Sequence, residues 1–264
     1  AFDPVGLDQT FTFWTVVAPR TVFAGVRELE PGHVRIYDGD RVDDRVYWQP
    51  SYPADFTGSL YEATEAVSAA LARATELRML RADVDVGSYL SGGLDSSLIA
   101  TLGLAAKGAG FQTFSLRFAD AEYDEGAFQR LMSAKLGTTH HEIVVSRADI
   151  AREFPRVIWH AERPILRTAP APMFLLSRLV REHGIKVVLT GEGADEMFAG
   201  YDLFREAAVR RFWARAPQST QRPRLLDKLY PYLARSPVAQ RAMAQSFFGQ
   251  NLASWREPGF GHEP

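Results

Sequence analysis

Cysteine is absent from all 264 residues of the sequence. Without thiols this stretch has no disulfide framework, no thiolate metal site and no cysteine nucleophile, and their absence fits a reducing compartment. No apolar run approaches the ~20 residues that a membrane span needs, and the beginning of the sequence lacks the basic start and apolar core of a signal peptide. We therefore expect a chain that does not enter a membrane and works in the cytoplasm.

An excess of positive charge is also absent. The formal net charge is −2, with 30 Lys and Arg residues against 32 Asp and Glu residues. This balance creates no global field that would attract nucleic acid or an acidic membrane surface. We expect neither a nucleic-acid partner nor a membrane partner, so ligands must bind at local sites.

The middle of the sequence alternates short apolar runs with amphipathic segments. The runs predict strands, and the amphipathic segments predict helices. Alternation of this kind implies βαβ units, so the predicted fold class is α/β, a doubly wound parallel sheet with helices on both faces. The strands are expected over 84–90, 111–118, 140–146 and 185–191, and the helices over 60–80, 97–107, 125–137, 149–161 and 171–184.

The two ends of the chain follow other patterns. Before residue 58 we expect a short β-rich segment, because β-prone runs occur at 11–18 and 33–39 between turn residues. After the last predicted strand the pattern is helical only, with proline starts at 223–234 and 236–250. This part is predicted to be an all-helical extension.

The first predicted strand runs into "SGGLDSS", residues 91–97. In open α/β sheets ligands bind beyond the carboxyl ends of the strands. Gly92 and Gly93 allow a tight turn that brings N–H groups close to an anion, and the serines add hydroxyl donors beside the N-terminus of a helix. Asp95 would repel bare phosphate, so it implies a divalent cation, Mg²⁺ with a nucleotide. The alternative is a glycine turn with a Ser/Asp helix cap.

The last predicted strand is followed by a second cluster, "LTGEGADEMFAGY", which ends at Tyr201. If both strand ends open onto one crevice, Asp95 and Asp195 can share the metal-bound phosphates. Glu192 is then left to meet a substrate or to transfer a proton. The alternative is a capped loop whose acids are solvated.

Two other groups of residues are candidates for ligand binding. The histidines of "THHE", which begins at Thr139, alternate in direction along a strand and are therefore not expected to share a metal ion. Arg163 and Arg167 precede a predicted helix, where they could reach a carboxylate or a phosphate.

"SGGLDSS" together with "LTGEGADEMFAGY" resembles the synthetase half of the glutamine-hydrolysing asparagine synthetases, which belong to the ATP-pyrophosphatase (PP-loop) group. The heptapeptide alone is typical of the wider PP-loop group. The two motifs together are typical of the smaller asparagine synthetase family. "TVVAPRTVFAGVRELEPGHVRIYDG" also resembles the closing strands of the family's glutaminase domain. The resemblance divides the chain into a glutaminase remnant at 1–57, an ATP-pyrophosphatase synthetase domain at 58–215 and an incomplete helical extension at 216–264. Because glutaminase domains of this family use an N-terminal cysteine, we expect this stretch to hydrolyse no glutamine.

The resemblance also implies a role for particular residues. Leu116 contacts adenine through its backbone, and Thr190 and Gly191 lie near the nucleotide. Asp95 and Asp195 bind Mg²⁺ and pyrophosphate, and Glu192 belongs to the formation or use of β-aspartyl-AMP. The residues of the pyrophosphate loop are Leu90, Ser91, Gly92, Gly93, Asp95, Ser96 and Ser97.

The activity implied by the resemblance is that of a carbon–nitrogen ligase of the asparagine synthase type. ATP adenylates aspartate with release of pyrophosphate, and ammonia from glutamine then forms the amide. Relatives that close β-lactam rings are expected to carry tyrosine at position 192, so Glu192 favours amide formation. One alternative is an amidotransferase that acts on another carboxylic acid, and a second is a nucleotide-binding fragment without turnover. We also expect that the chain can form a homodimer.

Overall fold

The computed structural model describes residues 1–52, 56–229 and 241–256. The chain divides into two compact units, Ala1–Thr190 and Gly191–Pro264. The domain bounds at 57 and 215 that the sequence suggests remain predictions. Among the described residues, no helix is both long and apolar enough to cross a membrane.

The first unit begins with a helix where a strand was expected. α1 (Pro4–Phe13) takes in the start of the β-prone run 11–18, so the strand predicted there is wrong. Asp3 caps the helix, since its side chain accepts hydrogen bonds from two N–H groups of the first turn, and proline occupies a position that tolerates the missing N–H. The start signal therefore outweighs the β propensity of the aromatic residues.

A hairpin follows in the same unit. β1 (His33–Asp38) and β2 (Arg41–Val46) pair antiparallel, with Tyr37 opposite Val42. This confirms the second β-prone run, 33–39, as a strand.

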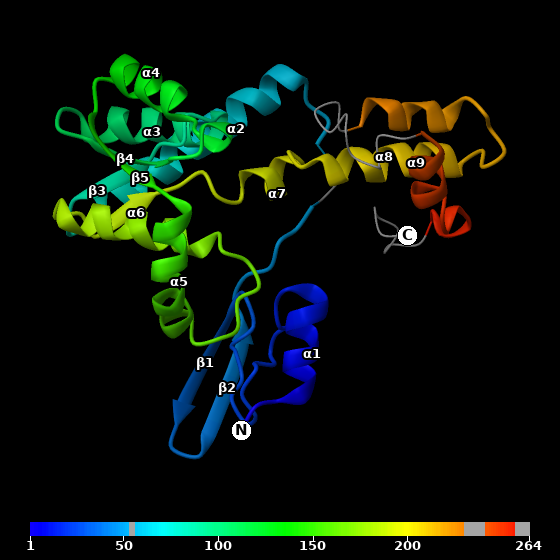
Figure 1. The fold of residues 1–264 in the computed structure, drawn as a ribbon, viewed down its shortest axis with the longest axis horizontal. Helices are drawn as coiled ribbons and strands as arrows, with labels where there is room; N and C mark the ends of the chain where they lie inside the picture. Colours follow the sequence, from blue (N-terminus) through cyan, green and yellow to red (C-terminus); the bar gives the residue numbers. More distant parts are fainter. Residues whose placement is uncertain (53–55, 230–240, 257–264) are drawn as a thin grey trace. The chain divides into compact units, whose positions relative to one another are not determined.

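Four parallel strands form the central sheet (Figure 1). They are β3 (Val86–Tyr89), β4 (Gln112–Phe118), β5 (Thr139–Val145) and β6 (Val187–Leu189). Their order is β5-β4-β3-β6, so the chain winds outward from β3 in one direction and then returns to its other side. This confirms the doubly wound sheet, whose switch point lies beside β3.

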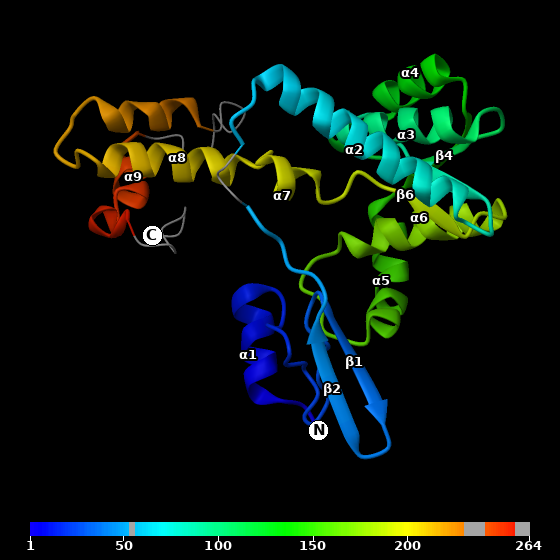
Figure 2. The ribbon, with the colours of Figure 1, turned by 180° about the vertical axis from the view of Figure 1, so that it is seen from behind.

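Helices cover both faces of this sheet, as Figures 1 and 2 show. α3 contacts β3 and α4 contacts β4 on one face, α2 packs on α3, and α6 packs on β4 and β5 from the other face beside α5. The bounds are α2 (Leu60–Leu80), α3 (Leu94–Lys107), α4 (Gly126–Leu136), α5 (Arg147–Ala161) and α6 (Pro170–Glu182), with a short 3₁₀ turn η1 (Ala121–Tyr123) before α4. The predicted helices agree with these bounds to within three residues.

The two faces of the sheet differ in chemistry. The α6 face contains an apolar core cluster of Phe114, Leu176, Val180 and Ile185. The α3 face carries buried polar residues instead, and Thr113 Oγ1 lies 3.0 Å from the Nδ1 of His140. Helix α4 therefore packs on a sheet face that carries hydrogen-bonding side chains rather than a purely apolar surface.

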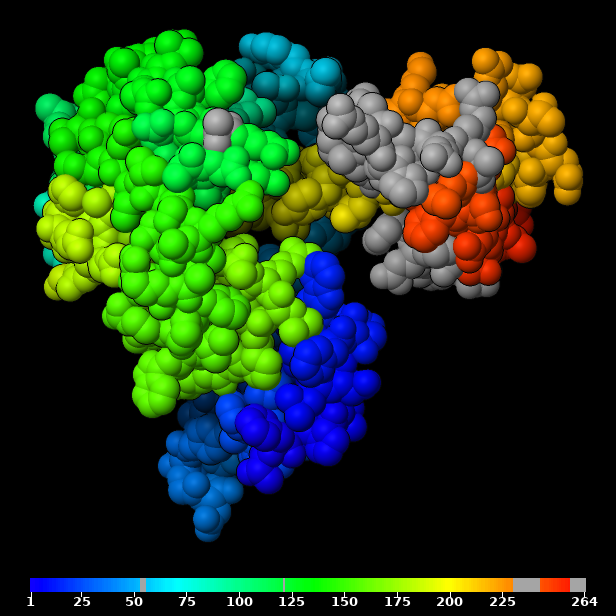
Figure 3. Space-filling model, in the orientation of Figure 1, coloured from blue at the N-terminus to red at the C-terminus, as the bar shows by residue number. Residues whose placement is uncertain are grey.

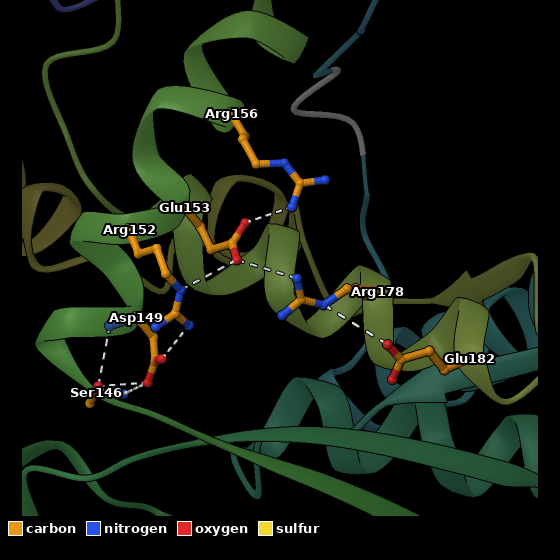
Figure 4. Close-up of polar contacts among 7 residues, drawn as sticks. All are labelled: Ser146, Asp149, Arg152, Glu153, Arg156, Arg178 and Glu182. Carbon is orange, nitrogen blue, oxygen red and sulfur yellow. Dashed lines mark hydrogen bonds and ion pairs between the residues drawn. The ribbon is translucent and has the colours of Figure 1, made fainter.

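A buried carboxylate joins α5 to α6 (Figure 4). Glu153 on α5 is 6% exposed, and its oxygens lie 2.9 Å from Arg156 Nη1 and 3.3 Å from Arg178 Nη1 on α6. Burial raises the pKa of Glu153, but the hydrogen bond from Arg178 and the charges of the two arginines outweigh it, so the pKa is lowered. The charged form of Glu153 is therefore the one that holds the two helices together.

The second unit is helical. It contains α7 (Ala194–Phe198), α8 (Asp202–Ala214), η2 (Arg222–Lys228), α9 (Arg241–Phe248) and η4 (Leu252–Ser254). Trp213, Leu226 and Phe248 belong to its core cluster, and Figure 3 shows the gold, orange and red atoms of this unit packed together. The helical prediction is confirmed for these elements, and residues 230–240 of the two predicted C-terminal helices lie outside the described residues.

Candidate functional site

The loop "SGGLDSS" leaves the sheet at its switch point. Leu90, fully buried after β3, donates its N–H to the Phe114 carbonyl at 2.9 Å, and its own carbonyl accepts from the Ser115 hydroxyl. The chain is thus fixed on the sheet up to the first residue of the loop. Beyond it, Ser91 and Gly93 are exposed.

Serine side chains brace the loop from within. Ser96 Oγ accepts from the Ser91 N–H at 3.1 Å, lies 2.8 Å from Ser91 Oγ, and donates to the Gly93 carbonyl at 3.3 Å. Ser91 Oγ in turn accepts from the Gly93 N–H at 3.2 Å. Because its hydroxyl is used in these bonds, Ser96 shapes the loop. Ser97 is half-buried and lies in the first turn of α3.

Gly92 has the backbone conformation and the close contact that require glycine. Its φ is +85°, and a Cβ at this position would lie 2.8 Å from Phe128 Cβ and 2.9 Å from the Gln129 nitrogen of α4. Helix α4 therefore packs directly on the loop. Gly93 precedes α3 without a side-chain cap, so the N–H groups of the first turn are left for an anion at the positive end of the helix.

Asp95 lies in the first turn of α3 and is half-buried. Among the described residues its carboxylate has no hydrogen-bond or ion-pair partner, and that part of the chain holds no cluster of three or more metal-ligating side chains. Mg²⁺ in nucleotide sites is usually held by one or two carboxylates together with phosphate oxygens. A single unpaired carboxylate beside an anion-binding loop fits that mode of binding.

The peptide groups of Leu116 form an open edge beside the loop. Leu90 N–H donates to the Phe114 carbonyl, so Phe114 directs its carbonyl toward β3. Peptide groups along a strand alternate between its two edges, so Leu116 directs its N–H and C=O to the same side as Phe114. β3 has ended at Tyr89 by this point. The Leu116 carbonyl accepts a hydrogen bond from Gln129 Nε2 at 3.0 Å.

The carboxyl ends of β3 and β6 lie at the same edge of the sheet. Ser88 pairs with Leu189 in the parallel register, and Ser88 Oγ donates to the Leu189 carbonyl at 3.2 Å. Thr190 follows β6, is exposed, and is the last residue of the first unit. The loop at 91–97 and Thr190 therefore follow neighbouring strands.

The residues of the second motif from Gly191 onward belong to the second unit. Glu192 is exposed and Asp195 is half-buried in α7. A Cβ on Gly200 would lie 1.9 Å from Asp195 Oδ1, so this glycine makes room for the carboxylate. The Tyr201 hydroxyl donates to Glu196 at 3.1 Å, which together with the charges of neighbouring acids raises the pKa of Tyr201. The N-cap of α7 is Gly193 and no side chain caps this helix, so the expectation that Asp195 caps it is wrong. The interpretation of Asp195 as a phosphate ligand remains a prediction.

A charged cluster near the end of β4 was not predicted from the sequence. Arg117 binds Asp124 with two hydrogen bonds, of 3.0 and 2.7 Å, and reaches Glu142 at 3.2 Å. The hydrogen bond from Arg117 lowers the pKa of Asp124 to about 2. Gly126 lies beneath the guanidinium, where a Cβ would come within 2.2 Å of Arg117 Nε. This pair fixes the connection from β4 to α4 and is therefore part of the frame of the site.

The two histidines and Arg167 make contacts away from the loop. His140 lies beside Thr113, whereas His141 stacks on Phe114 with ring centroids 5.2 Å apart, so the two histidines point to opposite faces as expected. The Arg167 guanidinium lies 3.9 Å from the centre of the Trp14 ring. Arg167 therefore packs against the N-terminal segment.

A doubly wound α/β sheet with a glycine–serine loop at its switch point defines a class of proteins that bind anionic, nucleotide-like ligands there. The asparagine synthase family profile matches residues 66–259, and the chain belongs to that family. This family assignment confirms the resemblance drawn from the two motifs.

Curated relatives carry both synthetase and amidase names. The chain is 30% identical to "Asparagine synthetase [glutamine-hydrolyzing] 1" of Bacillus subtilis, over 83% of this chain and 34% of that protein. It is 35% identical to "Amidase chyE" of Penicillium rubens, over 72% of this chain and 31% of that protein. The chain thus spans about a third of the length of these relatives.

Solved structures with a similar fold include two NAD synthetases. The NH3-dependent NAD synthetase from Campylobacter jejuni aligns with a TM-score of 0.38 and 19% identity, over 52% of this chain and 60% of that chain. The glutamine-dependent NAD+ synthetase from Acinetobacter baumannii, in complex with ADP, aligns with a TM-score of 0.40 and 21% identity, over 60% and 30% of the two chains.

Proposed function

We propose that the chain is the synthetase part of an ATP-dependent amidotransferase-type ligase that makes asparagine from aspartate. The observation that carries this proposal is the loop at 91–97, braced by its serines at the carboxyl end of β3, in a chain of the asparagine synthase family. The β-carboxylate of aspartate attacks the α-phosphorus of ATP, and pyrophosphate leaves. Ammonia derived from glutamine then attacks the acyl carbon of β-aspartyl-AMP, AMP leaves, and asparagine is formed.

The chemistry explains why such a loop is needed. A carboxylate is a poor electrophile, so it must be adenylated before ammonia can attack it. Negative charge develops on the leaving pyrophosphate, and fixed N–H donors stabilise that charge more in the transition state than in bound ATP. In this chain the uncapped N–H groups in the first turn of α3 supply those donors.

The carboxylates have separate roles in this proposal. Asp95 would hold Mg²⁺, and the family motif implies the same role for Asp195. Mg²⁺, when bound, neutralises charge on the phosphate oxygens. Glu192 orients the acyl-adenylate or moves a proton from the attacking ammonia. Thr190 and Gly191 lie next to the nucleotide.

The base is recognised by the backbone at the end of β4. The N–H of Leu116 donates a hydrogen bond to N1 of adenine, and its carbonyl accepts a hydrogen bond from the 6-amino group. Guanine presents a donor at N1 and an acceptor at position 6, so the same edge discriminates against it. The open edge beyond Tyr89 supports this arrangement.

A second candidate function comes from the names of the relatives. The two fungal proteins named amidases are each 35% identical to the chain, and proteins named asparagine synthetases are 30% to 39% identical to it. An amidotransferase that adenylates another carboxylic acid would use the same loop and the same metal. A homodimer and a cytoplasmic location remain predictions.

The experiment that separates these functions measures pyrophosphate release by the purified protein. The assay contains ATP, Mg²⁺, ammonium chloride and one acid from a panel, and ammonium replaces the glutaminase step. Release with aspartate and formation of asparagine would support the first function. Release with another acid would support the second, and ATP binding without release with any acid would contradict both.

A further inference from the structure

Gln129 lies between the two parts of the structure that contact the nucleotide in the proposed function. It is in α4 and is 2% exposed. Its Nε2 donates to the Leu116 carbonyl at 3.0 Å, and its backbone nitrogen is 2.9 Å from the point where a Cβ on Gly92 would lie. One residue therefore touches both the end of β4 and the glycine turn of the loop.

The hydrogen bonding of Gln129 is incomplete. Its Oε1 is buried and has no hydrogen-bond partner among the described residues. The carboxamide cannot improve this by flipping, because Oε1 would then face the oxygen of Leu116. Burying an acceptor without a donor costs free energy. An apolar side chain of similar size would avoid that cost, so stability alone does not explain a glutamine at this position.

The bond that Gln129 does make acts on the open edge of the sheet. β3 ends at Tyr89, so no strand among the described residues holds the Leu116 peptide on that side. A carbonyl oxygen has two lone pairs, and Nε2 uses one of them. The other stays available for a donor in the plane of the peptide. Gln129 thereby replaces the missing strand as the partner that fixes the orientation of this carbonyl.

We propose that Gln129 is a positioning residue for the nucleotide base, which fixes the Leu116 peptide so that the site takes a purine with a 6-amino group and rejects one with a 6-oxo group. This inference rests on the proposed function of the Leu116 edge. Gln129 acts through Leu116 and does not itself contact the reacting atoms.

The test compares ATP with ITP, which carries a 6-oxo group, in the full chain. Gln129→Met keeps the length of the side chain and removes the carboxamide, and Gln129→Glu keeps its shape but replaces the donor by a carboxylate. We expect each variant to raise KM and the calorimetric Kd for ATP about tenfold, the worth of one net hydrogen bond. We expect kcat to change less than about twofold, because the reacting atoms are untouched. Affinity for ITP should not change, so the preference for ATP narrows about tenfold.

The matched control is Ser133→Ala, which removes another buried polar group of α4, one turn further from the loop. It should leave KM for ATP and the ratio of ATP to ITP unchanged. We also expect Gln129→Met to unfold at about the temperature of the wild type, because it removes the unpaired acceptor together with the hydrogen bond to the Leu116 carbonyl.

Three results would overturn the inference. A folded Gln129→Met or Gln129→Glu protein with wild-type affinity for ATP and ITP would overturn it alone. An equal loss of affinity for both nucleotides would show a structural role without base selection. A wild-type protein that binds no ATP would overturn the proposed function, and the inference with it.

Discussion

At the residue scale, the carboxylate of Asp95 gives the sharpest prediction about activity. Its side chain has no partner among the described residues, so its loss should cost the fold little. A metal ligand, in contrast, contributes several kcal/mol of charge stabilisation in the transition state. We expect Asp95→Asn to lower the rate of pyrophosphate release by at least about 100-fold without changing the melting temperature.

The control for Asp95 is Asp85→Asn. Asp85 is an exposed carboxylate that pairs with Lys107 at 2.6 Å, before the start of β3. Pyrophosphate release by that variant should equal the wild-type rate. Wild-type activity of Asp95→Asn would rule out the metal assignment.

Gly92 gives a prediction about the fold at the same scale. An alanine there would have a positive φ and would also press on the backbone of α4. We expect Gly92→Ala to lower the free energy of unfolding by about 1–3 kcal/mol and to abolish ATP binding. Gly137→Ala separates the two causes, because Gly137 has φ +68° with open space around it. If chemical denaturation shows equal losses for the two variants, the contact with α4 is not the reason for glycine at 92.

At the element scale, the Arg117–Asp124 pair predicts a pH dependence of the connection between β4 and α4. The hydrogen bond from Arg117 lowers the pKa of Asp124 from its usual 3.8 to about 2. The stabilisation from this pair is therefore complete above pH 3.8 and is lost as the pH falls toward 2. The difference in free energy of unfolding between wild type and Asp124→Asn should shrink over that range, as urea titrations at several pH values would measure. A difference that stays constant down to pH 2 would contradict this origin.

The elements themselves could be predicted to a large extent from the sequence. All four strands of the sheet and the five helices around it follow the hydrophobic periodicity, which reports burial directly. The first β-prone run, 11–18, was misjudged because it was interpreted from its β-prone residues alone, without the helix start at Asp3. A helix cap is a contact between a few atoms, whereas β propensity is averaged over many residues, so an average over the run does not register the cap.

The frame of the candidate site was much less predictable. The loop at 91–97 has a recognisable pattern of residues, so its position could be inferred. The bond from Gln129 to Leu116 and the pair of Arg117 with Asp124 could not be. Each joins a residue at the end of β4 to a residue 7 or 13 positions later. Whether the two side chains come within bonding distance depends on the conformation of the turn between them. Nothing in the composition of that turn fixes its path.

At the scale of the whole molecule, each unit has a core of its own. Trp213 is buried in the core of the second unit, whereas its neighbour Phe212 is 42% exposed. We expect Trp213→Ala to destabilise that unit by about 3–5 kcal/mol, and Phe212→Ala to cost much less. Hydrogen exchange measured by mass spectrometry should show lost protection in α8 and α9 with unchanged protection in β4. Equal loss of protection in β4 would contradict separate cores.

The strand order β5-β4-β3-β6 has a consequence for how the protein is made. Ser88 and Leu189 are neighbours in the sheet, yet they are 101 positions apart in sequence. On the ribosome, β3, β4 and β5 emerge early and can associate while β6 has still to be synthesised. The β3 edge stays uncovered through this interval, and closing such a long loop is slow. The β3 edge, which is internal in the finished sheet, is thus an exposed strand edge on the nascent chain until β6 is made, and a chaperone could protect it during that interval.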